Sequence, residues 1–289
     1  KRMLKNNVLV RKLTGRETAG SLNILLTDTT GTLTKGSLEV IGIISGDNKQ
    51  YCSEIEMTNY RRYHELLKKS LLYNNESSYS SDEKIIGGNI TDKALLKFIK
   101  SNKDKKIDVI DKIPFDSKNK YSAVSIKDDG KLINLFKGSP EKILPECRFY
   151  YDAFGNKKNF INRNEFTKNI SKYTKKGIRV LTLATSENKS LNSFYNFCLV
   201  GIVLIADEVR PEAIKGVELV KQAGIQTVMI TGDNIDTATT IAKEVGIVEE
   251  KDDIIMTSQE LNSMSDDELK KILPNLRVVA RSLPQDKSW

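Results

Sequence analysis

Residues 22–34 read LNILLTDTTGTLT, an apolar run that ends at Asp28 and continues into a small polar loop. An apolar run of this length, bounded by Thr and Gly residues, predicts a strand over Leu22–Thr27 and a sharp loop after it. Asp28 would then lie at a strand end, where a carboxylate can act as a nucleophile. On this stretch alone, an aspartate that caps a helix or a turn is the alternative.

Two later runs repeat this pattern of a strand that ends in polar residues. Thr227–Ile230 precedes the sequence TGDN at 231–234, and Arg277–Ala280 precedes Arg281. Because strand ends of this kind meet at one edge of a parallel sheet, we expect a ligand site there.

The segments between these strands predict helices. Apolar residues recur at helical spacing over 235–245, with Thr231 or Asp233 as the expected cap and Gly246 after the end. A strand at Ile254–Met256 and a helix from about Ser258 to Ile272 follow. Strands that alternate with helices indicate an α/β fold with a parallel, doubly wound sheet.

The stretch between Lys35 and about Ala206 has a different pattern, because its strands and helices do not alternate strictly. It predicts an α+β domain inserted into the first one, with a polar surface loop at Asn75–Lys84. The predicted strands are Leu38–Ile44, Ser122–Ile126, Ile133–Phe136 and Cys198–Ile205, and the predicted helices are Asn59–Tyr73, Thr91–Ser101 and Asn164–Lys175.

Composition limits the function classes. The 289 residues allow two domains, and three cysteines and one histidine match no multi-histidine metal site and no Ser-His-Asp triad. No apolar run approaches the roughly 18 residues of a membrane span. Six of the eight net positive charges lie in residues 1–16, which suits either a solvated basic helix end or a segment beside a membrane and does not favour nucleic-acid binding.

Five motifs in a fixed order carry a resemblance to a known family. They are DTTGTLT at 28–34, KGSPE at 137–141, DEVRP at 207–211, TGD at 231–233 and AR-x-x-P-x-x-K at 280–287. The set resembles the cytoplasmic part of the P-type cation-transporting ATPases, which belong to the haloacid dehalogenase superfamily. The motifs span most of the chain.

The resemblance implies a phosphorylation site. Asp28 would accept the γ-phosphoryl group of ATP, with Thr231 and Lys287 on the phosphoryl oxygens and Mg²⁺ held by Asp28 and the carbonyl of Thr30. It also implies contacts of Asp233 and Arg281 with the nucleotide.

The resemblance further implies a nucleotide pocket in the inserted domain. Phe115 would stack on adenine, which Asp92 would also contact from the TDKAL helix start, and Lys120 and Arg179 would approach the ribose and phosphates. Lys137 would line the pocket, with Gly138 allowing a close approach of the backbone. Surface charge is the alternative for Lys120 and Arg179, and a core side chain for Phe115.

The implied organisation is discontinuous. Residues 1–13 would be a membrane-proximal basic stub, 14–36 and 207–289 a Rossmann-like phosphorylation domain, and 37–206 the inserted nucleotide-binding domain. The phosphorylation domain would be incomplete at its C-terminal end, because the GDGxND segment of the family does not occur. The implied parent is a multi-pass membrane pump for a calcium-like or other light cation, with this part monomeric, on the cytoplasmic side and without a nucleic-acid partner.

One departure from the family keeps other functions open. Thr29 stands where the family has lysine, which removes a cation next to the reacting phosphate. The chain could therefore be a non-catalytic nucleotide-binding variant. A free-standing phosphatase or phosphotransferase of the haloacid dehalogenase type is a third possibility, although Thr30 stands where those enzymes carry a second aspartate.

Overall fold

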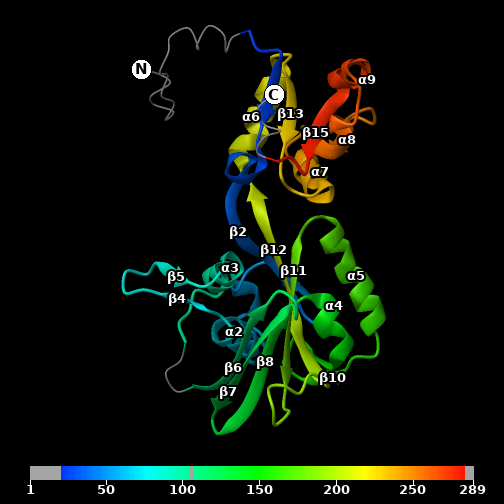
Figure 1. Cartoon of the computed structure of the whole chain (residues 1–289). Coiled ribbons are helices and arrows are strands. Elements are labelled where there is room, and N and C mark those ends of the chain that lie inside the picture. Colours follow the sequence, from blue (N-terminus) through cyan, green and yellow to red (C-terminus); the bar gives the residue numbers. More distant parts are fainter. Residues whose placement is uncertain (1–20, 104–106, 284–289) are drawn as a thin grey trace. The chain divides into compact units, whose positions relative to one another are not determined.

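The computed structural model describes residues 21–103 and 107–283 of the chain (Figure 1). These residues form two compact units. Unit 1 contains residues 21–36 and 209–283, and unit 2 contains residues 37–208 except 104–106. The predicted basic stub at 1–13 lies outside the described residues.

Unit 1 is built on a four-stranded parallel sheet, and the α/β class expected from the sequence is confirmed. The strand order is β1 (Ile24–Thr27), β13 (Gln226–Ile230), β15 (Leu276–Ala280) and β14 (Ile254–Thr257). Parallel strands need crossover connections, and helices supply them here.

Successive strand residues point to opposite faces of this sheet. Because apolar side chains lie on both faces, helices cover both of them. Met229 and Val278 pack in one core with α6 (Pro211–Gln222) and α7 (Ile235–Glu244). Val228 and Val279 pack in the other, with side chains from α8 (Ser258–Asn262) and α9 (Asp266–Ile272).

Two local predictions in unit 1 are wrong. The helix expected from about Ser258 to Ile272 is two helices, because Ser265 and Glu268 form a capping box that starts α9 anew. The start of α7 is capped by Asn234, whose Oδ1 accepts from Thr237 N at 3.0 Å, and not by Thr231 or Asp233.

Unit 2 is built on a nine-stranded, mostly antiparallel sheet. Its main path runs β10-β9-β12-β11-β8-β7-β6, and β2 pairs with β12 and β3. The strands are β2 (Thr34–Ile44), β3 (Gln50–Tyr51), β6 (Asp108–Asp116), β7 (Tyr121–Asp128), β8 (Lys131–Gly138), β9 (Cys147–Tyr151), β10 (Lys157–Asn159), β11 (Arg179–Ser186) and β12 (Phe197–Val209).

The two faces of this sheet each carry a core (Figure 1). On one face, Val124 and Leu135 pack with α2 (Arg61–Tyr73) and α3 (Ile90–Ile99). On the other, their neighbours Ala123 and Phe136 pack with side chains from α4 (Pro140–Ile143) and α5 (Arg163–Lys175). Successive side chains of β7 and β8 are thus buried on opposite faces of the sheet, one set against α2 and α3 and the other against α4 and α5.

The polar stretch Asn75–Lys84 is not only a loop. It contains β4 (Ser77–Tyr79), which pairs with β5 (Ile85–Gly87) in a separate two-stranded sheet. Serine-rich polarity hid this hairpin, since β propensity reflects pairing partners as much as residue type. In the part of the chain that the structure describes, no helix is both long and apolar enough to span a membrane.

Candidate functional site

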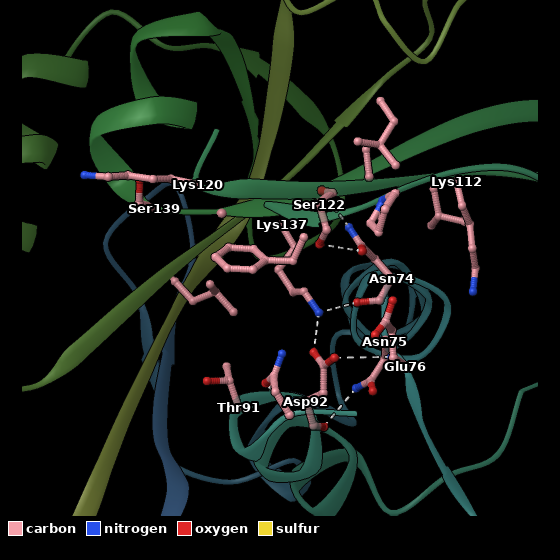
Figure 2. A pocket seen from close by; sticks show the side chains of 18 of the residues that line it. Asn74, Asn75, Glu76, Thr91, Asp92, Lys112, Lys120, Ser122, Lys137 and Ser139 are labelled. Atoms are coloured by element: carbon pink, nitrogen blue, oxygen red, sulfur yellow. Dashed lines mark hydrogen bonds and ion pairs between the residues drawn. The ribbon is translucent and has the colours of Figure 1, made fainter. Parts of the chain in front are cut away.

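A cavity of about 580 Å³ lies in unit 2 between the sheet and the segments around α2 and α3 (Figure 2). The loop after α2 and the start of α3 form one wall, and β6, β7, β8 and the start of β11 form the others. This volume falls in the range of about 300–1,000 Å³ that small-molecule sites occupy.

The structure brings the six residues predicted to contact a nucleotide in this domain to the same cavity. They come from four regions of the chain and all line its walls: Asp92, Phe115, Lys120, Lys137, Gly138 and Arg179. Their convergence depends on the order of the strands, in which β8 lies between β7 and β11.

A buried ion pair forms the floor of the cavity. Lys137 Nζ donates to Asp92 Oδ1 and to the carbonyl of Asn74, each at 2.5 Å (Figure 2). The Lys137 side chain is 8% exposed and that of Asp92 is 3% exposed. Burial lowers the pKa of Lys137, and the attraction and hydrogen bond of Asp92 oppose that shift.

The position of Asp92 is set by the N-terminal cap of α3. Asn89 precedes α3 and accepts from Asp92 N at 2.9 Å, which caps the helix. The Asp92 carboxylate then accepts from Glu76 N at 3.3 Å through Oδ2, while Oδ1 binds Lys137. Both oxygens of this carboxylate are engaged by protein donors.

The remaining charged residues lie at more exposed parts of the cavity. Lys120 Nζ binds Glu141 Oε1 at 3.1 Å, with both side chains more than half exposed. Arg179 Nη1 donates to Thr91 Oγ1 at 2.7 Å. Phe115 is 57% exposed, which rules out the core alternative for this ring and leaves an aromatic face open to a planar ligand.

Gly138 allows a close approach of backbone to backbone. A Cβ at this position would lie 2.6 Å from the Lys120 carbonyl oxygen and 2.7 Å from Tyr121 Cβ. The space that glycine leaves is thus filled by the turn that carries Lys120.

Gly138→Ala is therefore expected to displace the Lys120 turn and to weaken ligand binding at the cavity. It should also cost about 1–3 kcal/mol of stability, as overpacking does. Urea unfolding and ligand titration of the variant measure both effects.

Gly216→Ala is the matched control for Gly138→Ala. Gly216 lies in α6, and nothing lies within 4 Å of a Cβ there. Alanine should stabilise the helix by about 0.5–1 kcal/mol. Equal behaviour of the two variants would contradict the packing argument at Gly138.

In unit 1, predicted residues gather at the carboxyl edge of the parallel sheet. Asp28 follows β1, Thr231 follows β13 and Arg281 follows β15, and these three strands are consecutive neighbours. Thr231 is 2% exposed. Its Oγ1 donates to Asp233 Oδ2 at 3.1 Å, and Arg281 N donates to the Asp233 carbonyl at 2.9 Å. Lys287 lies outside the described residues.

The loop after Asp28 is held by Arg210, a residue that the sequence argument did not single out. Its Nε donates to the Thr34 carbonyl at 2.8 Å and its Nη2 to the Gly31 carbonyl at 3.2 Å. The DEVRP segment contains this arginine, so the motif was the available signal. Gly31 has φ +75°, and a Cβ on Gly36 would lie 2.9 Å from Gly31 Cα, so the loop needs glycine at both positions.

The side chain of Thr29 faces inward, unlike its neighbours. Thr29 is 1% exposed, whereas Asp28 and Thr30 are exposed. Its hydroxyl is buried and has no hydrogen-bond partner among the described residues. A buried hydroxyl without a partner costs free energy. Because the Thr29 side chain is buried, a lysine could not replace it without rearrangement of the loop.

The oxygens at this edge suit a hard cation. Asp28 offers a carboxylate and Thr30 a carbonyl, and Mg²⁺ is commonly bound through one or two carboxylates together with phosphate and water. Residues 21–103 and 107–283 contain no group of three or more His, Cys, Asp or Glu side chains arranged around a metal. One carboxylate and one carbonyl, completed by phosphate and water, match the ligands that Mg²⁺ commonly has.

Sequence reasoning missed the loop Asn74–Glu76, although all three residues line the cavity. Asn74 Nδ2 donates to the carbonyls of Ser122 and Leu135, at 3.0 Å each. In the sequence, two asparagines after a helix look like part of an ordinary polar surface loop. Only the contacts of Asn74 with β7 and β8 show that this loop belongs to the cavity wall.

Comparison with known proteins agrees with the resemblance. Residues 62–212, just over half of the chain, match the family model of the P-type ATPase cytoplasmic domain N. The chain is 33% identical over 314 residues to the probable calcium-transporting ATPase 6, plasma membrane-type, of Oryza sativa subsp. japonica. It is 32% identical over 301 residues to calcium-transporting ATPase 1 of Bacillus cereus.

These alignments cover 99% of the chain but only 30% and 33% of the two relatives. The chain thus spans about a third of the length of the proteins it matches. The motifs, the cavity and these matches together lead to one conclusion: the chain belongs to the P-type cation-transporting ATPases and corresponds to part of their cytoplasmic region.

Proposed function

We propose that this chain is the catalytic part of an ATP-driven cation pump, in which unit 2 binds ATP and Asp28 of unit 1 accepts its γ-phosphoryl group. The observation that carries this proposal is the convergence of six predicted nucleotide residues on one cavity of about 580 Å³. Residues distant in sequence that meet at a well-formed pocket make the default hypothesis for a binding site.

The chemistry of the cavity suits an adenine nucleotide. The exposed ring of Phe115 offers a stacking face for the base, and Lys137 can still donate a third hydrogen bond from its ammonium group. Lys120 and Arg179 offer positive charge where side chains are more exposed. We assign the base to the Lys137 end and the phosphates to the Lys120 and Arg179 end.

We further propose that unit 1 is the phosphorylation domain, with a haloacid-dehalogenase-like sheet. Its strand order and the polar residues at three adjacent carboxyl ends support this assignment. Asp28 is exposed and would act as the nucleophile, and Thr231 would donate its hydroxyl to a phosphoryl oxygen. Mg²⁺, when bound through Asp28 and Thr30, would neutralise charge on the transferring group.

The transported ion is assigned from the relatives. Those named above are described as calcium-transporting ATPases, and we propose calcium as the cargo of the complete protein. Membrane helices outside this chain would hold the ion. We place this part of the protein on the cytoplasmic side of the membrane.

Nucleotide binding can be tested on the chain itself. ATP should displace a fluorescent ATP analogue from the chain in a saturable manner with one site, and isothermal titration calorimetry should give the same dissociation constant. ADP should compete, because the base and ribose contacts are shared. No displacement by ATP at 10 times the concentration that saturates a known P-type ATPase would overturn the assignment of the cavity.

A further inference from the structure

A second groove of unit 2 lies apart from the nucleotide cavity, between α5 and the turn that joins β2 to β3. It has a volume of about 430 Å³ and shares no lining residue with that cavity. Asn48 of the turn and Gln50 of β3 line one side of it. Lys172 of α5 and Lys176, the residue that ends this helix, line the other. The volume suits a small molecule or a short peptide segment.

The helix side of this groove carries positive charge. Lys168, Lys172 and Lys176 follow one another at intervals of four residues, which places them in one row along the helix. All three are exposed, and none of them forms an ion pair with another described residue. The helix dipole favours cations in the last turn only, and like charges at this spacing repel each other. Helix stability therefore does not account for the whole lysine row.

The charged residues of the turn on the other side are directed away from the groove. The Asp47 carboxylate accepts from Ala153 N at 3.3 Å. The Lys49 ammonium lies 3.8 Å from the centroid of the Tyr60 ring. Neither Asp47 nor Lys49 lines the groove, whereas Asn48 between them does. Among the described residues that line the groove, none is acidic, so nothing there neutralises the lysines.

Uncharged groups complete the groove. The side-chain amides of Asn48, Gln50 and Asn169 line it, and each amide offers both donors and an acceptor. The Tyr173 hydroxyl donates to Gln50 Oε1 at 3.4 Å and so connects α5 with β3. Ile170 is 2% exposed and provides an apolar surface at the base. Amides beside an apolar surface suit a peptide backbone, whose N–H and C=O groups need both kinds of partner.

The spacing of the lysine row suits an extended peptide. Four residues of an α-helix rise by about 6 Å, and alternate side chains on one side of an extended strand lie about 6.6 Å apart. Acidic side chains at alternate positions can therefore each meet one lysine. A single-stranded nucleic acid would in addition stack its bases on exposed rings. Tyr173, the aromatic residue of the groove, is instead half-buried with its hydroxyl engaged.

We propose that this groove docks an extended acidic segment of a partner protein. Carboxylates at alternate positions of the segment pair with Lys168, Lys172 and Lys176, and its backbone bonds to the side-chain amides of the groove. The proposal does not depend on the nucleotide site, because the two sets of lining residues are separate.

The experiment uses two fluorescein-labelled peptides of the same composition. Acids alternate in the peptide ETETETE and are consecutive in the peptide EEEETTT. Fluorescence anisotropy measures the affinity of each peptide for the wild-type chain, for Lys172→Gln, for Lys176→Gln and for the double variant. The control is the double variant Lys127→Gln and Lys131→Gln, which removes the same charge from exposed positions of β7 and β8 outside the groove.

The wild-type chain should bind ETETETE more tightly than EEEETTT, and added salt should weaken both, because it screens exposed ion pairs. Each single substitution should weaken ETETETE by about two- to fivefold, the effect of one exposed ion pair. Loss of both lysines should weaken it by about 4- to 25-fold. The control variant should bind as the wild type does, and all variants should keep the wild-type affinity for ATP.

Four results would overturn the inference. The wild-type chain might show no saturable binding of ETETETE, or bind both peptides equally well. The control variant might lose as much affinity as the groove variant. Finally, oligothymidylate might displace the labelled peptide more effectively than unlabelled ETETETE does, which would assign the groove to nucleic acid. Since ATP affinity is measured on the same samples, each of these failures is distinguishable from a failure of the proposed function.

Discussion

Replacing Phe115 by alanine is expected to weaken ATP binding to this chain by roughly 5- to 150-fold, because a base stacked on an aromatic ring contributes about 1–3 kcal/mol. The ring is 57% exposed at the cavity wall, so it spends little of its surface on the protein core. The variant should therefore keep its fold. Calorimetric titration with ATP measures the loss, and thermal unfolding checks the fold.

Phe154→Ala is the control for Phe115→Ala. Phe154 is 65% exposed in the same unit, and its ring packs against Tyr60 away from the cavity. Its removal should leave the affinity for ATP within about twofold, the effect of a change under 0.5 kcal/mol. An unchanged ATP affinity in Phe115→Ala would remove the stacking role from this ring.

The second large effect is expected at Asp28. In the complete protein, Asp28→Asn should lower formation of a phosphorylated intermediate by about 10³-fold or more, the scale on which removal of a covalent nucleophile acts. An amide is isosteric with the carboxylate but cannot form the acyl phosphate. ATP binding should be unchanged, because the proposed nucleotide cavity lies in unit 2. Incorporation of ³²P from γ-labelled ATP measures the first effect.

Asp236→Asn provides the matched comparison in unit 1. Asp236 is an exposed aspartate in the first turn of α7. Its replacement removes the same charge and should leave phosphorylation near the wild-type level. A similar loss of label in both variants would point to a general effect of charge or stability and away from a nucleophile.

Much of unit 1 could be predicted from the sequence, because its strands are short apolar runs with polar residues after them. The run before Asp28 and the run before Thr231 both form strands, and these pair in parallel in register from Ile24 with Gln226 to Thr27 with Met229. The predictions that were wrong in unit 1 concern where single helices begin. Ser265 looked like an interior helix residue until its capping box with Glu268 was seen.

Unit 2 was harder, since its order depends on contacts between distant segments. The strand β6 was not predicted, because residues 108–116 mix charged and apolar side chains without a clear alternation. The hairpin of β4 and β5 lies in a stretch that reads as a polar loop. In both cases pairing with another strand, and not local propensity, decides the structure.

In the candidate site, too, the sequence identified residues but not the contacts between them. Motifs named Asp92 and Lys137, but no pattern in the sequence says that they form a buried ion pair across 45 positions. Nor does it say that the Asp92 carboxylate also accepts from the backbone N of Glu76, or that Glu76 lines the same cavity. A motif identifies the residue type at a position, whereas the hydrogen bonds that its side chain forms depend on how distant segments pack together.

The central claim is that ATP bound by unit 2 phosphorylates Asp28, and one measurement tests it most directly. The complete protein is incubated with Mg²⁺ and γ-labelled ATP and quenched in acid, and the labelled peptide is identified by mass spectrometry. We expect one acid-stable, hydroxylamine-labile phosphate, located on Asp28. A protein that binds ATP but carries no such label, or carries it on another residue, would contradict the account.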